Sequence, residues 1–181
     1  EAYSLLVDLY EGMVNRYGAD KITIVGDSSG GGLAAGIVET FGHYDLPQPA
    51  QLVLVSPMLD ISMRNPQIHE YFDIDPVLAP WGIAQIGDLW ADGDDVTLPR
   101  LSPINGDVSI LRNVTTFVGT REIFYPDCVK WDEKLEAAGI NHKLVVGVGL
   151  NHNWPLSPIP EARVARKQIA GIVGAGAKGV R

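Results

Sequence analysis

Residues 21–35, KITIVGDSSGGGLAA, constrain the fold more strongly than any other stretch of the chain. The β-branched run Lys21–Val25 has the composition of a buried strand. Gly26 is expected to end this strand, and an apolar stretch of helical character follows at residues 33–41. The segment therefore predicts a strand, a very tight turn and a helix in immediate succession.

Ser28 lies at the centre of this turn, in the pattern G-x-S-x-G that is typical of a nucleophile elbow. A serine on such a turn presents its hydroxyl clear of the backbone. Neighbouring turns then approach so closely that we expect Gly26 and Gly30 both to be required. The start of the helix directs backbone N–H groups toward the site, so the N–H of Ser29 is a predicted oxyanion donor. The competing interpretation is a glycine-rich turn without chemistry, since short matches of this kind also occur by chance.

The remaining chain alternates predicted strands with predicted helices. Further buried strands are expected at residues 51–55, 114–118 and 142–148. Helices are expected at residues 2–17, 29–41, 126–138 and 160–173. This alternation predicts the α/β class, with a mostly parallel sheet of about four strands flanked by helices. Residues 61–112 are less regular and are interpreted as a lid-like or irregular insertion, and residues 1–181 together are interpreted as the C-terminal part of a single domain.

The candidate base is one of four histidines. His152 alone lies just past the carboxyl end of a predicted strand, which is where the sites of parallel sheets are found. His43 and His69 lie in connections, and His142 begins a strand at the edge away from the expected site. We therefore predict that His152 is the catalytic base.

The candidate acid is Glu122, in the turn after the third predicted strand. Asp127 is the second choice, because an acidic residue in the first turn of a helix is also explained by the helix dipole. Asp60, after the second strand, is a distant third. The resulting order of Ser28, Glu122 and His152 is the chain order of the α/β-hydrolase arrangement.

Nearly the whole chain resembles the hormone-sensitive-lipase-like esterases of the α/β-hydrolase family, whose GDSAGG elbow is similar to GDSSGG here. The other matching features are Ser56-Pro57 with Asp60, Ser102-Pro103, residues 119–124, residues 137–139, and His152 before an aromatic residue. Glu122 stands where the family usually has Asp, and Asn153 stands where it usually has Gly. The resemblance implies ester hydrolysis through an acyl-enzyme by Ser28, His152 and Glu122, without a metal or other cofactor.

The resemblance also implies parts that this sequence does not contain. Members of the family carry an HGGG-type oxyanion loop before the elbow, an N-terminal cap, and an eight-stranded sheet of which this chain would supply strands five to eight. The strand Lys21–Val25 would then be an edge with unpaired backbone groups. We therefore expect the missing N-terminal half or another copy of the chain to cover this edge. Since oxyanion donors would be missing, we expect the isolated chain to be slow or inactive.

Composition and charge exclude several classes of partner and site. A net charge of −8 argues against a nucleic-acid partner. No apolar run reaches the length of about 18 residues that a membrane-spanning helix needs. Cys128 is the only cysteine, so neither an intrachain disulfide nor a cysteine zinc cluster can form. The chain begins at Glu1 inside a helical pattern, so we expect a fragment or processed product of cytoplasmic location, with a lost targeting signal left open.

Two other functions compete with an esterase. A hydrolase-like small-molecule binding protein would keep the fold and the pocket, but loss of the histidine is the simplest way to silence such a site, and His152 is present. The segment GDSSGG also matches the GDSGG of chymotrypsin-like proteases, in which the histidine precedes the serine and disulfides support an all-β fold. We therefore predict a serine esterase for small or short-chain esters, with the binding protein as the alternative.

Overall fold

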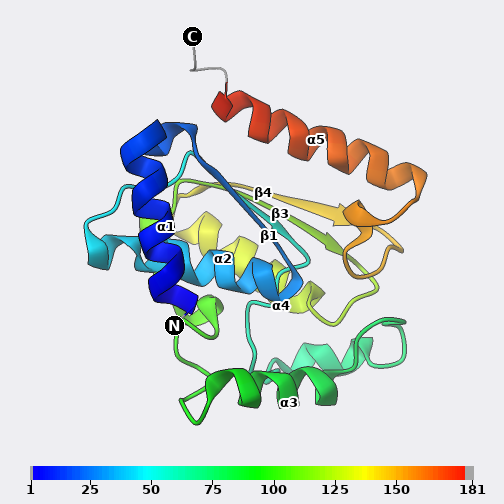
Figure 1. Cartoon of the computed structure of the whole chain (residues 1–181). Coiled ribbons are helices and arrows are strands. Elements are labelled where there is room, and N and C mark those ends of the chain that lie inside the picture. Colours follow the sequence, from blue (N-terminus) through cyan, green and yellow to red (C-terminus); the bar gives the residue numbers. More distant parts are fainter. Residues whose placement is uncertain (1, 178–181) are drawn as a thin grey trace.

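Four parallel strands form one sheet in the order β1-β2-β3-β4 (Figure 1). The computed structural model describes residues 2–177. The strands are β1 (Thr23–Asp27), β2 (Gln51–Val55), β3 (Asn113–Gly119) and β4 (Asn141–Gly147). The α-helices are α1 (Ala2–Tyr17), α2 (Ser28–Thr40), α3 (Pro80–Ala91), α4 (Tyr125–Ala137) and α5 (Pro160–Ala177). The predicted α/β class with a parallel sheet flanked by helices is confirmed.

Helices cover both faces of the sheet, so the central strands are apolar on both sides. Side chains alternate between the faces along a strand. Leu52 and Leu54 of β2 pack in one cluster with residues of α1, α2 and α4. Val53 and Val55 pack in another cluster with Ala165 of α5, which crosses the opposite face of the sheet in Figure 1. This arrangement brings the carboxyl ends of all four strands to one rim.

The first strand lies two residues later than predicted. Residues Ala19–Lys21 form a short 3₁₀ helix, and β1 runs through Gly26 to Asp27 instead of ending before them. Gly26 pairs with Leu54 and Asp27 with Val55 in the parallel register, so glycine does not interrupt this strand. The other predicted strands agree within one or two residues, and α5 extends beyond its predicted end.

Residues 61–112, which the sequence indicates as the least regular part of the chain, contain regular elements in the structure. They include α3 and three short 3₁₀ helices, and they pack around a third apolar cluster. Hydrogen bonds tie the segment to the main body, from Asn65 to Asp127 and from Ser102 to Asp60. That the segment is a lid stays a prediction.

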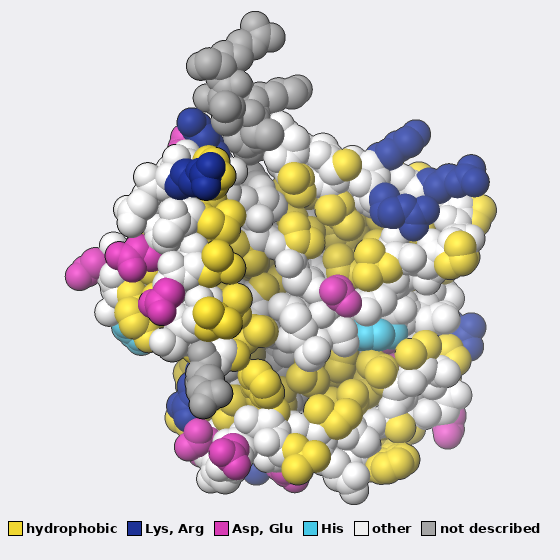
Figure 2. Space-filling view, viewed as in Figure 1, with side chains coloured by type: hydrophobic (Ala, Val, Ile, Leu, Met, Phe, Trp, Pro, Cys, Tyr) yellow, Lys and Arg dark blue, Asp and Glu magenta, His cyan; other side chains and the backbone are white. Residues whose placement is uncertain are grey.

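Both outer strands of the sheet, β1 and β4, have an unpaired edge within the described residues. β1 has β2 as its only neighbour there. Val25 is 49% exposed beside the free edge of β1, and Leu5 and Leu9 of α1 are 69% and 57% exposed. Figure 2 shows hydrophobic side chains running along α1, and a groove of about 300 Å³ lies between α1, β1 and α2. The edge therefore carries apolar surface as well as free backbone groups.

Candidate active site

Ser28 lies at the junction where β1 passes directly into α2. Its φ of 53° is in the left-handed region that residues other than glycine rarely adopt. The serine is the first residue of the helix, so the turn between the two elements is as short as it can be. Strained backbone of this kind is characteristic of a nucleophile elbow, in which the turn aims the hydroxyl away from the backbone.

The elbow glycines are not equivalent. A Cβ at Gly26 would overlap the carbonyl oxygen of Gly30, and one at Gly31 would lie 2.8 Å from the Cβ of Pro57. A Cβ at Gly32 would overlap the carbonyl oxygen of Met58. At Gly30, however, a Cβ would meet no other atom within 4 Å, so the prediction that a side chain there would clash is wrong. The crowding at Gly31 and Gly32 comes from the chain after β2, which crosses the first turn of α2.

Ser28, His152 and Glu122 form a continuous hydrogen-bonded chain at the rim. The Nε2 atom of His152 lies 3.0 Å from Oγ of Ser28, and its Nδ1 atom lies 2.8 Å from Oε2 of Glu122. The Glu122 side chain is fully buried and that of His152 is 8% exposed. Because a carboxylate can only accept at Nδ1, the imidazole carries its proton there and leaves Nε2 free to accept from the serine hydroxyl.

Glu122 is anchored by its second oxygen. Oε1 accepts hydrogen bonds from the backbone N–H of Gly119 at 2.6 Å and from Oγ of Ser56 at 2.8 Å. The Phe124 ring meets the His152 imidazole edge-on, with 5.4 Å between ring centroids. The carboxylate therefore has a fixed orientation, although a glutamate side chain is longer than the aspartate usual at this position.

The second-choice acid, Asp127, has a different partner. Its Oδ1 accepts from Nδ2 of Asn65 at 2.7 Å, and no hydrogen bond joins it to His152. Burial raises the pKa of Asp127 to about 6, an effect that the Asn65 hydrogen bond partly opposes. Asp60 accepts from Ser62 and Ser102. The structure thus brings Glu122, rather than either aspartate, against the histidine.

His142 and His69 have partners other than the serine. His142 contacts the carbonyl oxygen of Ile140 through Nδ1 and lies 3.4 Å from Asp132 through Nε2. His69 packs its ring against Phe72. Neither makes a hydrogen bond to Ser28.

Two residues of the site were not predicted as such from the sequence. Ser56 accepts the backbone N–H of Asn153 at 3.0 Å and donates to Glu122. Asn153 has φ 55°, a left-handed conformation in which asparagine substitutes for glycine more readily than most residues do. Its side chain also donates to Asp27 at 3.2 Å. The one sequence signal for Ser56 is the Ser-Pro pair that follows the second strand, and this pair is among the features that resemble the family.

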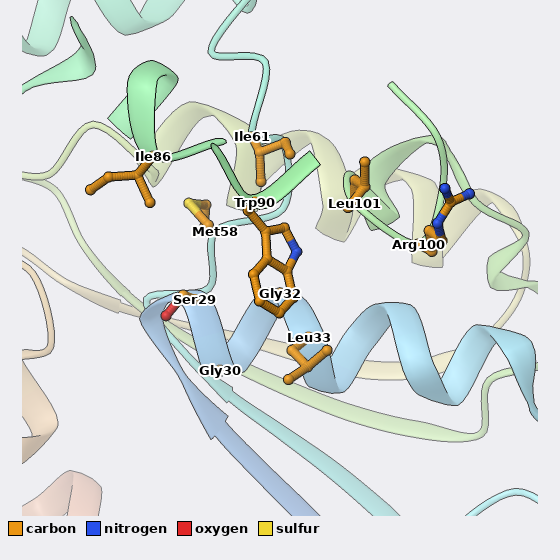
Figure 3. Close-up of a pocket in the computed structure, with 10 residues that line it drawn as sticks. All are labelled: Ser29, Gly30, Gly32, Leu33, Met58, Ile61, Ile86, Trp90, Arg100 and Leu101. Carbon is orange, nitrogen blue, oxygen red and sulfur yellow. The ribbon is translucent and has the colours of Figure 1, made fainter. Parts of the chain in front are cut away.

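An apolar pocket of about 300 Å³ adjoins the elbow at Ser29. Figure 3 shows Trp90 and Ile86 of α3 over the first turns of α2, where Gly32 and Leu33 lie. The remaining lining residues are Gly30, Met58, Ile61, Arg100 and Leu101. The pocket can accept an apolar group beside Ser29, whose N–H belongs to the unpaired first turn of α2.

No group of three or more His, Cys, Asp or Glu side chains among residues 2–177 is arranged to hold a metal ion. None of the helices in that range combines the length and hydrophobicity that crossing a membrane requires.

Comparison with known proteins identifies the family. The family model of the alpha/beta hydrolase fold matches residues 1–156 of the chain. The chain belongs to the α/β-hydrolase fold family. This α/β hydrolase is 29% identical over 174 residues to an esterase from Acinetobacter venetianus, covering 94% of this chain and 57% of that protein. It is 28% identical over 141 residues to an ethyl acetate hydrolase from Pseudomonas putida, covering 75% and 43%.

Solved structures give the same result. The α/β hydrolase superimposes on EstE7, a hormone-sensitive-lipase homologue from a metagenome library, with a TM-score of 0.91 and 28% identity. The match covers 97% of this chain and 61% of EstE7. The resemblance to hormone-sensitive-lipase-like esterases is thus confirmed. The chain spans about half the length of the curated relatives that it matches.

Proposed function

We propose that this α/β hydrolase is a serine carboxylic-ester hydrolase that works through an acyl-enzyme on small or short-chain esters. The observation that carries this proposal is the unbroken hydrogen-bonded chain from Ser28 through His152 to Glu122. Each member has the role its chemistry allows: the hydroxyl is the nucleophile, the imidazole is the base, and the carboxylate orients the imidazole.

The reaction follows from this geometry in two halves. Nε2 of His152 takes the proton of Ser28 as Oγ attacks the ester carbonyl carbon, and Glu122 stabilises the imidazolium that results. The carbonyl oxygen becomes an oxyanion, to which the Ser29 N–H is the donor available at the elbow. His152 then gives its proton to the departing alcohol oxygen, which leaves an ester on Ser28. In the second half, His152 takes a proton from a water molecule whose oxygen attacks the acyl carbon. It then returns this proton to Oγ of Ser28 as the bond between Oγ and the acyl carbon breaks, which releases the acid and restores the free serine.

The substrate class rests on the pocket and on the relatives. The apolar pocket beside Ser29 is suited to a small apolar acyl or alcohol group of an ester. The matching relatives named as an esterase and an ethyl acetate hydrolase favour esters over amides as substrates of this chain too. Helix α3 lies within residues 61–112 and forms one wall of the pocket. We therefore propose that this segment acts as a lid and also contacts the substrate.

We expect the 181-residue chain alone to react slowly. The elbow offers the Ser29 N–H, whereas the resemblance to hormone-sensitive-lipase-like esterases implies further donors from a loop that precedes the elbow. Loss of one oxyanion donor lowers kcat by roughly 100- to 1,000-fold in other hydrolases. Hydrolysis of a short-chain nitrophenyl ester by this chain at ordinary esterase rates would contradict this expectation.

We further propose that a β-strand from a longer form of the polypeptide covers the open edge of β1, because exposed strand edges with apolar neighbours favour aggregation. Hydrogen exchange tests this, since the outward N–H groups of β1 are protected only when the edge is paired. A second copy in this place would make protection depend on protein concentration. A well-folded monomer with freely exchanging β1 amides would refute the proposal.

The decisive test of the function is labelling with a fluorophosphonate probe, on the longest form of the protein that is available. We expect one adduct, on Ser28, and its loss in Ser28→Ala and His152→Ala. The matched control is His142→Ala, which removes another histidine that lies beside a carboxylate but far from the elbow. Reversible ligand binding without any labelling would instead identify the non-catalytic binding protein.

A further inference from the structure

Ser56 occupies a special position between the proposed acid and the loop that carries the base. It follows the last residue of β2, is fully buried, and has φ 45°. Its backbone N–H donates to the carbonyl oxygen of Phe117 at 2.7 Å, which continues the pairing between β2 and β3 by one residue. The strained backbone turns the Ser56 side chain toward the rim instead of continuing the strand.

The direction of each hydrogen bond at the Ser56 hydroxyl is determined by its partners. The backbone N–H of Asn153 can only donate, so Oγ accepts there, at 3.0 Å. The hydroxyl then has a single proton left, and the nearest acceptor is Oε1 of Glu122 at 2.8 Å. One side chain therefore connects Glu122 with the residue that follows His152.

This connection decides which oxygen of Glu122 faces the histidine. Oε1 receives donors from Ser56 and from the N–H of Gly119, so Oε2 is the oxygen available to His152. A glutamate has one more rotatable bond than an aspartate, so its carboxylate needs more restraint to stay in one orientation. At the same time, the bond from Asn153 fixes the loop that positions the imidazole.

We propose that Ser56 is a positioning residue for the reaction, acting through both Glu122 and the His152 loop. This inference rests on the proposed function and adds a fourth side chain to it. Ser56 does not touch the reacting atoms, so its removal slows the chemical step and leaves substrate binding unchanged. A hydrogen bond to a charged group accounts for roughly a 10- to 100-fold loss of kcat when it is removed.

The chain offers a matched control in Ser102. It is also fully buried, and its hydroxyl likewise accepts one backbone N–H, that of Ile61, at 3.0 Å. It makes its further hydrogen bonds to the carbonyl oxygen of Val96 and to Asp60, away from Glu122 and His152. Ser102→Ala thus removes a hydroxyl that is as deeply buried as that of Ser56, and it leaves the proposed triad unchanged.

The test compares Ser56→Ala, Ser56→Gly and Ser102→Ala in fluorophosphonate labelling and ester hydrolysis. Ser56→Gly is included because glycine tolerates positive φ. A loss of labelling rate or kcat that both variants share is therefore caused by the missing hydroxyl rather than by backbone strain. We expect both Ser56 variants to label about 10- to 100-fold more slowly and to lose kcat at constant KM. Ser102→Ala should stay within about twofold of the wild type, because it leaves the bonds to Glu122 intact.

A second measurement reports the geometry independently of activity. The Nδ1 proton of His152 gives a downfield NMR signal when it is bonded to Glu122, and we expect this signal to shift or broaden in both Ser56 variants but not in Ser102→Ala. Wild-type labelling rates together with an unchanged signal in the Ser56 variants would overturn the inference and leave the esterase proposal intact. A wild-type protein that does not label would overturn the esterase proposal instead, and the NMR comparison would still decide whether Ser56 positions the histidine.

Discussion

Glu122 and Glu39 are both buried glutamates, yet their surroundings differ in every other respect. Glu122 is fully buried at the rim and has hydrogen-bond partners in Gly119, Ser56 and His152. Glu39 is 8% exposed near the far end of α2, and neither of its carboxyl oxygens has a partner among the described residues. Burial alone therefore does not distinguish a carboxylate that has hydrogen-bond donors from an isolated one.

The difference lies in the donors that replace water. Close to Glu39, the Nζ atom of Lys134 donates to the carbonyl oxygens of Ile104 and Gly106 rather than to the carboxylate. Burial raises the pKa of Glu39 to about 8, an effect that the charge of Lys134 opposes and that of Asp107 reinforces. The rim supplies hydrogen-bond donors to the carboxylate of Glu122. No such donor reaches Glu39 among the described residues, so its protonated form is favoured up to a higher pH.

The largest expected effect comes from Glu122→Gln. The amide can keep its oxygen toward Ser56 and Gly119, so its NH₂ group would face Nδ1 of His152 and force the wrong tautomer. Given the proposed function, we expect kcat to fall about 10⁴-fold, as with the equivalent change in other triads. Glu39→Gln is the control, with kcat within about twofold of the wild type. Equal activity of the two variants would contradict the proposed role of Glu122 in the reaction.

Glu39→Gln should have the next largest effect, on stability. The unfolded chain releases this proton near pH 4.5 and the folded protein near pH 8, so the free energy of unfolding falls as the pH rises between these values. The full shift corresponds to roughly 5 kcal/mol. Urea unfolding at pH 5 and pH 8.5 should show this fall in the wild type and a much smaller one in the variant. An equal fall in both proteins would mean that Glu39 ionises normally.

Asp127→Asn is an intermediate case, because Asn65 satisfies one of its oxygens and the other has no partner. The pKa of Asp127 is raised from 3.8 to about 6, so the free energy of unfolding falls as the pH rises through that window. In the wild type we expect this fall to amount to about 2–3 kcal/mol, and in Asp127→Asn we expect it to be absent, as measured by urea unfolding across this pH range. Esterase activity should be retained, and its loss would return Asp127 to consideration as the acid.

The smallest effect is expected at Gly30, the uncrowded position of the elbow. A Cβ there meets open space within a helix, so Gly30→Ala should leave stability unchanged or raise it by about 0.5–1 kcal/mol. Gly32→Ala is its contrast, because its Cβ overlaps the Met58 carbonyl oxygen and the backbone would have to move. Thermal unfolding of the two variants measures this, and a destabilised Gly30→Ala would show that the first turn of α2 has no free space.

Most of the fold could be predicted because its elements have strong local patterns. Apolar β-branched runs identified the four strands, and the spacing of apolar residues identified the helices. The exception is Gly26, because the local pattern predicts the end of β1 there whereas pairing with Leu54 keeps the residue in the strand. Glycine signals a turn only where no neighbouring strand holds the backbone extended, and that neighbour is remote in the sequence.

The site was partly predictable for the same reason. Residues that follow parallel strands meet at one rim, which is why Ser28, Glu122 and His152 could be selected before the structure was known. Their hydrogen-bonded arrangement agrees with that selection, and their catalytic roles remain our proposal. The hydroxyl of Ser56 bridges Glu122 and Asn153, which are both distant from it in the sequence. No local sequence pattern therefore predicts this bridge.

The left-handed backbone at Asn153 has a consequence for how such chains are recognised. Geometry at this position admits a small set of residues, of which glycine is the commonest and asparagine a natural substitute. A search motif that demands glycine after the histidine would therefore discard this polypeptide, although its loop has the required shape. Signatures of this kind discriminate better when they specify a torsion angle than when they specify a letter.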